Sequence, residues 1–183
     1  MSAVRVSMSG LITQARLLAN DPSGASAVFT DQQVQDILDQ NAFQAMYEQL
    51  SEIENIAAGG AVEYKKFSAA RGYWESDTLL VNGNYAQLTP SDSDFLAGVW
   101  KFTSTQSLPV LIYGVWYDIN AAAAELWKLK ATKFAEQFDA AVDGASYSLS
   151  QKYNQALTMA KEFRSKAVGS SGITHLRRSD VAD

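Results

Sequence analysis

The chain has 183 residues, 47% of them hydrophobic and 19% charged, which are globular values and exclude a wholly disordered chain. Its net charge of −5 excludes the broad basic surface of a general nucleic-acid-binding protein. The absence of cysteine excludes disulfides, thiolate zinc sites and cysteine nucleophiles, and it indicates a reducing compartment.

The N-terminal part of the chain predicts a short helix rather than a targeting segment. Residues Met1–Gly10 contain no continuous apolar stretch, so they do not read as a secretory signal. Since no run elsewhere is long and apolar enough to cross a bilayer, we expect no membrane partner. The helix spans about residues 9–19, where apolar residues recur at helical spacing, and it ends at the breaker Asn20–Gly24.

A second helix is predicted over about residues 30–45. Thr30 and Gln33 have the spacing of a capping box, in which the threonine hydroxyl and the glutamine side chain each satisfy a backbone amide. Val34, Ile37 and Leu38 follow on one stripe. The stretch 47–56 fits either a continuation of this helix or a strand.

Between about residues 50 and 114 the pattern predicts short antiparallel strands. Aromatic and β-branched pieces alternate with turn signals, and Asn82-Gly83-Asn84 is typical of a hairpin because Asn-Gly accepts positive φ. Two further strands are predicted at 97–102 and 109–114. We expect this β-rich region to be an insertion that projects from the helices.

The C-terminal third predicts two more helices and a tail. One helix spans about residues 118–139 with Asp118 as its N-cap, and the other spans about 148–167 behind a capping box at Ser148 and Gln151. The fold class expected is α+β, mainly a bundle of about four helices with an inserted β-rich region. Residues 1–168 form one domain, and 169–183 form a flexible arm that begins with a Gly-Ser linker.

The usual catalytic patterns are missing from the sequence. The one histidine, His175, lies in the Gly/Ser-flanked tail, so neither a histidine base nor a histidine metal site is expected. Gly59-Gly60 lacks the spacing and the lysine of a phosphate loop. Asp92 and Asp94 lack the ligand periodicity of a calcium loop, and turn capping explains them better. We therefore predict no catalytic residue, cofactor or metal.

One alternative is a small carbohydrate-binding or carbohydrate-cleaving domain. Glycoside cleavage needs only two carboxylates, and exposed aromatic rings bind sugars. The carboxylates available for such a cleft are Glu63, Glu75, Asp77 and Asp118, and the aromatic residues are Tyr73, Trp74, Trp100 and Trp116. Structural roles explain these residues better: Trp100 and Trp116 fit core positions on strands, Asp118 fits a helix N-cap, and Glu75 and Asp77 fit solvated loops.

The four alanines that follow Asp118 suit close packing, either against the chain's own fold or against a neighbouring subunit. Alanine is the smallest apolar helix former, so a helix that begins with four of them can be approached closely. The residues suspected of contacting subunits or a partner are Ala121, Ala122, Ala124, Arg164, Ile173, His175, Leu176, Arg177 and Arg178.

The order of these features resembles the head–tail connector proteins of tailed bacteriophages, also called adaptor or head-completion proteins. None of the motifs is catalytic, and the resemblance extends over most of the chain. The segments that carry it are 30–41, Gly59–Tyr64, Gly72–Glu75, Gly98–Phe102, Tyr113-Gly114, Tyr117–Ala124, Phe138-Asp139, Asp143-Gly144 and Ser150–Lys152.

The resemblance implies a structural virion protein rather than an enzyme. Such proteins form a ring, commonly of twelve copies, between the portal and the next neck or tail component, and genomic DNA passes through it without sequence-specific binding. It implies a virion neck location, with host cytoplasm during assembly, and a C-terminal arm that grips the portal or a neighbour. An alternative within assembly is a tail-terminator or another neck protein.

Overall fold

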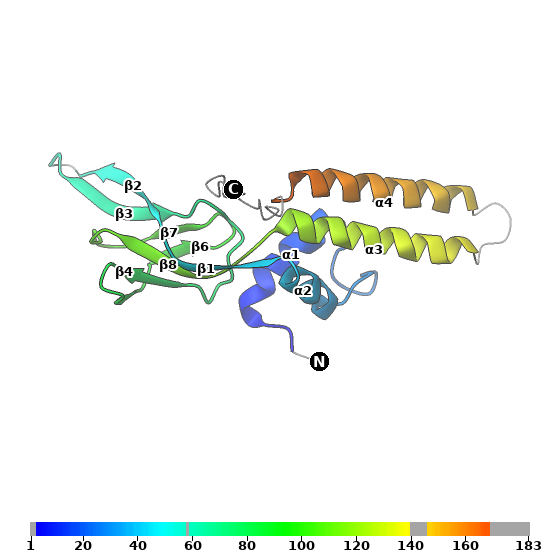
Figure 1. The fold of residues 1–183 in the computed structure, drawn as a ribbon, viewed down its shortest axis with the longest axis horizontal. Coiled ribbons are helices and arrows are strands. Elements are labelled where there is room, and N and C mark those ends of the chain that lie inside the picture. Colours follow the sequence, from blue (N-terminus) through cyan, green and yellow to red (C-terminus); the bar gives the residue numbers. More distant parts are fainter. Residues whose placement is uncertain (1–2, 58, 140–145, 169–183) are drawn as a thin grey trace, which may run out of the picture.

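The computed structural model describes residues 3–57, 59–139 and 146–168, and it is elongated, with a β-rich end and a helical end (Figure 1). We call the first the β unit (Ala42–Tyr117) and the second the helical half. Within the described residues there are four α-helices and eight strands in two antiparallel sheets. No described helix combines the length and apolar character needed to cross a membrane.

The helical half consists of a compact N-terminal part and a long helical hairpin. Its core joins α1, α2 and the first turns of α3, and the rest of α3 packs antiparallel on α4 (Figure 1). Its elements are the 3-10 turn η1 (Val6–Met8), α1 (Ser9–Leu18), α2 (Asp31–Asp39), α3 (Ile119–Asp139) and α4 (Ser146–Lys166).

Local capping explains where two of these helices begin. The Thr30 hydroxyl accepts a hydrogen bond from the Gln33 amide at 3.2 Å, and the Gln33 side chain accepts one from the Thr30 amide at 2.9 Å. This capping box confirms the predicted start of α2. Asp118 caps α3, because its Oδ1 accepts hydrogen bonds from the Asn120 and Ala121 amides at 3.1 and 3.0 Å.

The β unit contains two four-stranded sheets with an aromatic core between them. One sheet, which we call sheet A, has the order β1-β8-β4-β5, and the other, sheet B, has the order β2-β3-β7-β6. Phe67, Trp74, Trp100, Trp116 and their neighbours fill the space between the sheets. The strands are β1 (Ala42–Gln49), β2 (Ser51–Ile56), β3 (Val62–Ser68), β4 (Leu79–Asn82), β5 (Gln87–Leu88), β6 (Asp92–Asp94), β7 (Val99–Lys101) and β8 (Val110–Tyr117).

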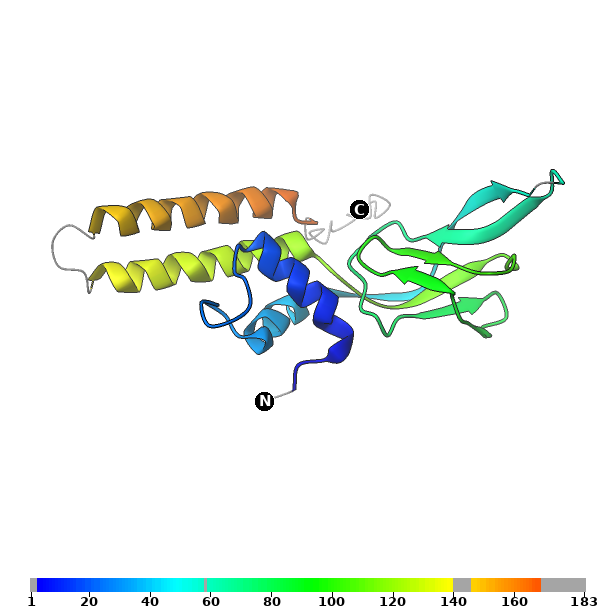
Figure 2. The ribbon, with the colours of Figure 1, turned by 180° about the vertical axis from the view of Figure 1, so that it is seen from behind.

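The chain enters and leaves the β unit through the paired strands β1 and β8. Ala42 lies opposite Tyr117, so the end of α2 and the start of α3 are brought together (Figure 2). Only Leu50, a buried residue, separates β1 from β2, and the chain changes sheets there. The β unit is therefore inserted between α2 and α3.

The expectation of a mainly helical bundle is wrong. The described residues are 38% helical and 27% strand, so two antiparallel sheets form a second structural half of an α+β fold. The helix predicted over 30–45 ends at Asp39, because residues 42–49 pair with β8. Residues 51–56 form β2, which resolves the ambiguous stretch as strand. The strands begin at Ala42 and end at Tyr117, beyond the predicted limits of 50 and 114.

Two predicted turns differ in detail. The Asn-Gly hairpin between β4 and β5 is present, but its loop has four residues, and positive φ occurs at Tyr85 (60°) rather than at Asn82 or Gly83. The Asn82 side chain accepts hydrogen bonds from the Asn84 and Ala86 amides, at 2.9 and 3.0 Å, and so holds this loop. The last helix starts at Ser146, two residues before the predicted cap at Ser148.

Candidate functional site

The alanines at the start of α3 are buried inside the chain's own helical cores. Ala121 is 4% exposed, and Ala122 and Ala124 are fully buried. Ala122 belongs to the core with α1 and α2, and Ala124 belongs to the α3–α4 core. Close packing here is therefore between helices of one chain, and these side chains offer little surface to a neighbour.

The other suspected contact residues divide into one that the structure describes and five that it does not. Arg164 is exposed on α4, where it is accessible to a partner. The predicted arm, residues 169–183, lies outside the described residues. The five suspected contacts within it are Ile173, His175, Leu176, Arg177 and Arg178.

The residues of the carbohydrate alternative do not form a sugar cleft. Trp74 and Trp100 are each 1% exposed and Trp116 is 5% exposed, so their ring faces are not available for stacking on a sugar. The Trp74 and Trp100 rings meet edge to face at 6.1 Å inside the β unit. Among the carboxylates, Asp118 caps α3 and Glu63 forms an ion pair with Lys65 at 2.8 Å.

Glu75 is the centre of a polar cluster that joins the N-terminus to the β unit. Its carboxylate accepts hydrogen bonds from Ser7 Oγ at 2.6 Å, Tyr117 Oη at 2.6 Å and Arg5 Nε at 2.9 Å. Burial raises the pKa of Glu75, but these hydrogen bonds outweigh it and hold the pKa below its ordinary value. Burial and the bond to Glu75 together raise the pKa of Tyr117.

This cluster is suited to holding the two halves together rather than to proton transfer. Arg5 also donates to the Asp39 carboxylate on α2, so one guanidinium contacts both the β unit and the helical half. All three groups that face Glu75 donate hydrogen bonds to its carboxylate. We call this cluster of Arg5, Ser7, Asp39, Glu75 and Tyr117 the polar clamp. The sequence did not predict it, because its members are up to 112 residues apart.

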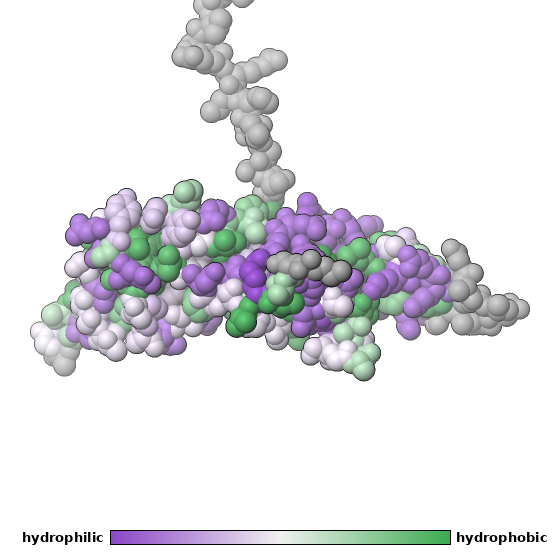
Figure 3. Space-filling view, turned by 90° about the horizontal axis from the view of Figure 1, so that it is seen from below, coloured by the Kyte–Doolittle hydropathy of each residue, from purple (hydrophilic) through white to green (hydrophobic). Residues whose placement is uncertain are grey.

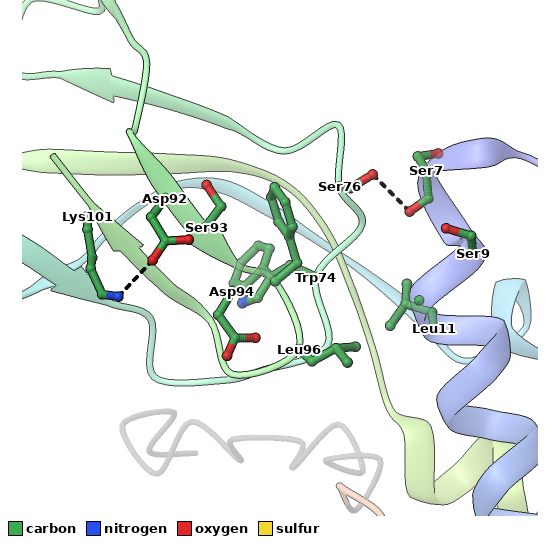
Figure 4. Close-up of a pocket in the computed structure, with 12 residues that line it drawn as sticks. Ser7, Ser9, Leu11, Trp74, Ser76, Asp92, Ser93, Asp94, Leu96 and Lys101 are labelled. Atoms are coloured by element: carbon green, nitrogen blue, oxygen red, sulfur yellow. Dashed lines mark hydrogen bonds and ion pairs between the residues drawn. The ribbon is translucent and has the colours of Figure 1, made fainter.

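A cavity of about 570 Å³ lies where the N-terminal helices face the β unit (Figure 4). Four serines line it, and the Ser76 hydroxyl donates to the Ser7 carbonyl at 3.1 Å. On the opposite wall Asp92 forms an ion pair with Lys101 at 2.7 Å, which holds the pKa of Asp92 below its ordinary value. Among the described residues no histidine lines the cavity, and these residues contain no cluster of metal-ligating side chains.

The most distinctive exposed surface is an aromatic patch on the outer face of sheet A. In the strand register Tyr113 of β8 lies opposite Met46 of β1 on one side and Leu79 of β4 on the other. Met46 is 68% exposed and Tyr85 is 65% exposed. We call the set Met46, Tyr47, Leu79, Tyr85 and Tyr113 the tyrosine patch.

Two tyrosines of this patch are held by left-handed backbone. Tyr47, at a β-bulge between Met46 and Glu48, has a φ of 56°, and Tyr85, in the β4–β5 loop, has a φ of 60°. The Tyr47 ring lies 5.1 Å from the Tyr85 ring and 5.3 Å from the Tyr113 ring. Left-handed φ is uncommon for residues with large side chains, and such strain concentrates at functional positions. No sequence signal marks these two conformations.

Exposed hydrophobic residues also occur away from the tyrosine patch. Leu17 on α1 is 72% exposed, and Leu129 on α3 is 44% exposed. Figure 3 shows one face of the molecule, where hydrophobic residues form separate patches over the β unit and the helical half. The chain thus has apolar surface on both halves.

No protein-family model, curated protein or solved structure matches the chain in the comparisons. We therefore base the function on the residues and surfaces described above, together with the resemblance in the order of sequence features.

Proposed function

We propose that this chain is a structural virion protein that forms an adaptor ring between the portal and the tail or next neck component of a tailed bacteriophage. The observation that carries the proposal is the tyrosine patch, an exposed aromatic surface on a projecting β unit. The proposed role is structural and not enzymatic. Its partners are further copies of itself, the portal and the next neck or tail protein, and it acts in the virion neck after assembly in the host cytoplasm.

The composition of the tyrosine patch favours protein contact. Tyrosine and methionine are enriched in protein interfaces, and exposed apolar patches on soluble proteins mark interaction sites. A tyrosine contributes a large apolar ring and a polar hydroxyl while few rotatable bonds are immobilised. Tyr47 and Tyr85 keep left-handed backbone at a cost of about 1–3 kcal/mol each, so the surrounding fold holds the two rings in this exposed arrangement.

The shape of the molecule also favours a ring. A ring needs a heterologous contact, in which two different surfaces of the same chain meet. The β unit and the helical half lie at opposite ends of an elongated molecule, and each has its own exposed apolar residues. The chain's net charge of −5 suits a channel through which DNA passes without being held.

The two alternatives make different predictions. A carbohydrate-binding domain would bind sugars through the exposed tyrosine patch, because the three tryptophans are buried. Binding of oligosaccharides would appear as a saturable change in tyrosine or tryptophan fluorescence. A tail-terminator would attach at the tail end of the neck rather than directly beneath the portal.

Electron microscopy of the full chain with its portal tests the proposal. We expect a ring of this protein on the portal's outer end, and we expect Tyr47→Ser with Tyr85→Ser to lose the contact made by the tyrosine patch. The matched control is Val4→Ser with Val6→Ser, which changes two exposed apolar residues outside the patch. A wild-type protein that never attaches to portals would contradict the proposal, and attachment only at the tail end would favour the terminator.

A further inference from the structure

The hairpin formed by β2 and β3 projects beyond the rest of the β unit (Figures 1 and 2). β7 pairs with β3 only at Lys66–Ser68. The outermost pairs, Asn55 with Glu63 and Ile56 with Val62, join only two strands. A two-stranded hairpin in water is marginally stable by itself, so a projecting hairpin of this kind gains stability when a partner covers it.

The side chains of the hairpin combine exposed apolar groups with unpaired acids. Ile56 is 72% exposed and Val62 is 46% exposed. Glu52 and Glu54 on β2 are exposed, and neither forms an ion pair with any described residue. The neighbouring Glu63, by contrast, is neutralised by Lys65. β2 therefore presents two carboxylates without an ion pair beside apolar surface, while the exposed Lys66 lies on β3, opposite Ile53.

Helix α4 carries the opposite charge. Its sequence has four basic residues and one acidic residue, whereas the β unit has eight acidic residues and four basic ones. Lys161 and Arg164 are exposed and three residues apart, so they lie near each other on the helix surface. Neither forms an ion pair within the described part of the chain, although Lys166 pairs with Glu162 at 2.6 Å.

We propose that the β2–β3 hairpin of one copy docks on α4 of the next copy, with Glu52 and Glu54 facing Lys161 and Arg164. This inference rests on the proposed ring, and it identifies the surfaces that close it. The two surfaces are complementary to each other but not to themselves, since two copies of α4 or two copies of β2 would repel. Such a pair gives the head-to-tail contact that a ring requires.

The contact is intermolecular because the two surfaces lie in different halves of one chain. β2 belongs to the β unit, whereas α4 packs along α3 in the helical half (Figure 1). In the described residues no ion pair connects α4 with the β unit. A second copy supplies both the missing cations for the hairpin and the missing carboxylates for the helix.

Cysteine cross-linking tests the geometry, because the natural chain has no cysteine. Full-length protein with both Glu54→Cys and Arg164→Cys is oxidised and run on a non-reducing gel. We expect a ladder of covalent multimers, whereas each single variant gives no more than weak dimers. The control combines Glu54→Cys with Lys128→Cys, which is exposed on α3, and we expect no ladder from it.

Charge reversal tests the attraction by sedimentation velocity at low salt. We expect Lys161→Glu with Arg164→Glu to weaken self-association about tenfold or more, and reversal of Glu52 and Glu54 to lysine in the same chain to restore it. The control, Lys101→Glu with Lys128→Glu, makes the same change in net charge on β7 and α3, outside both docking surfaces, and leaves association within about twofold of wild type.

The outcomes separate this contact from the adaptor function. The contact is wrong if the cross-linked ladder is absent, if the wild-type chain stays monomeric at every concentration, or if the control variant weakens association equally. It is also wrong, with the adaptor function intact, if the Lys161→Glu, Arg164→Glu variant forms normal rings on portals. Failure of the wild-type protein to form any portal ring would instead overturn the function.

Discussion

The core of the β unit and the core of the α3–α4 hairpin are built from side chains of very different size. Between the two sheets the large buried residues are aromatic, with Trp74, Trp100 and Phe67 each at most 1% exposed. In the α3–α4 hairpin the buried residues are mainly alanines, which let the two helices approach closely. The two halves should therefore respond oppositely to volume changes: the β unit should be sensitive to loss of volume, and the helical hairpin to gain.

The largest effect is expected in the aromatic core of the β unit. Trp100→Ala removes a side chain that packs against Trp74 and Phe95, and the cavity should lower the free energy of unfolding by about 3–5 kcal/mol. Urea unfolding followed by circular dichroism measures this loss. Tyr85→Ala, on the exposed patch, is the control and should change stability by less than about 0.5 kcal/mol. Equal losses for the two variants would contradict the assignment of Trp100 to the core.

The polar clamp between the two halves should give the next largest effect and a pH dependence. Glu75→Gln removes the charge that faces Arg5 while it keeps the side-chain shape, and it should cost about 2 kcal/mol at neutral pH. Since the pKa of folded Glu75 lies below its ordinary value of 4.5, its charge stabilises the fold above that pH. That contribution is lost as the pH falls through the folded-state pKa.

Chemical denaturation of wild type and Glu75→Gln between pH 3 and pH 7 measures this dependence. The difference in unfolding free energy between the two proteins should be constant near neutrality and shrink below about pH 4.5. Glu48→Gln is the control, because Glu48 forms an exposed ion pair with Arg71, and exposed pairs contribute at most about 1 kcal/mol. A difference in unfolding free energy between the two proteins that grows as the pH falls would contradict the stabilising role of the Glu75 charge.

The helical half was more predictable from sequence than the β unit because its signals are local. The capping box of Thr30 and Gln33, and the cap at Asp118, are defined by residues within one turn. Residues 42–45, by contrast, have helical propensity but pair with β8, about 70 positions away. Such pairing overrides propensity, and a sequence pattern does not show which distant strand will pair.

The candidate surfaces were predicted less well than the helices for the same reason. Tyr47, Tyr85 and Tyr113 come together only because a bulge and a four-residue loop adopt left-handed backbone beside β8. The alanines after Asp118 were suspected of contacting neighbours, yet their burial depends on where α1, α2 and α4 pack. Arg164 was predictable as exposed, but its lack of an ion pair with any other described residue was not.

Overpacking tests the other side of the comparison. Ala124→Leu adds volume at a fully buried site between α3 and α4, and it should cost about 1–3 kcal/mol as the helices are forced apart. Ala135→Leu lies on the exposed side of the same helix and should be nearly neutral, since leucine is also a good helix former. Thermal unfolding of the two variants measures the difference. Tolerance of Ala124→Leu would show that the hairpin is loosely packed.

The smallest effect is expected at the capping box at the start of α2. α2 has only nine residues, so the hydroxyl of Thr30 satisfies a substantial share of its free amides. Thr30→Ala should cost about 1 kcal/mol, whereas Thr30→Ser keeps the hydroxyl and should restore most of it. Hydrogen exchange at the Gln33 amide distinguishes local fraying from general destabilisation. Faster exchange there, without a change in the β unit, is the expected result, because α2 contributes to the helical core and not to the core between the sheets.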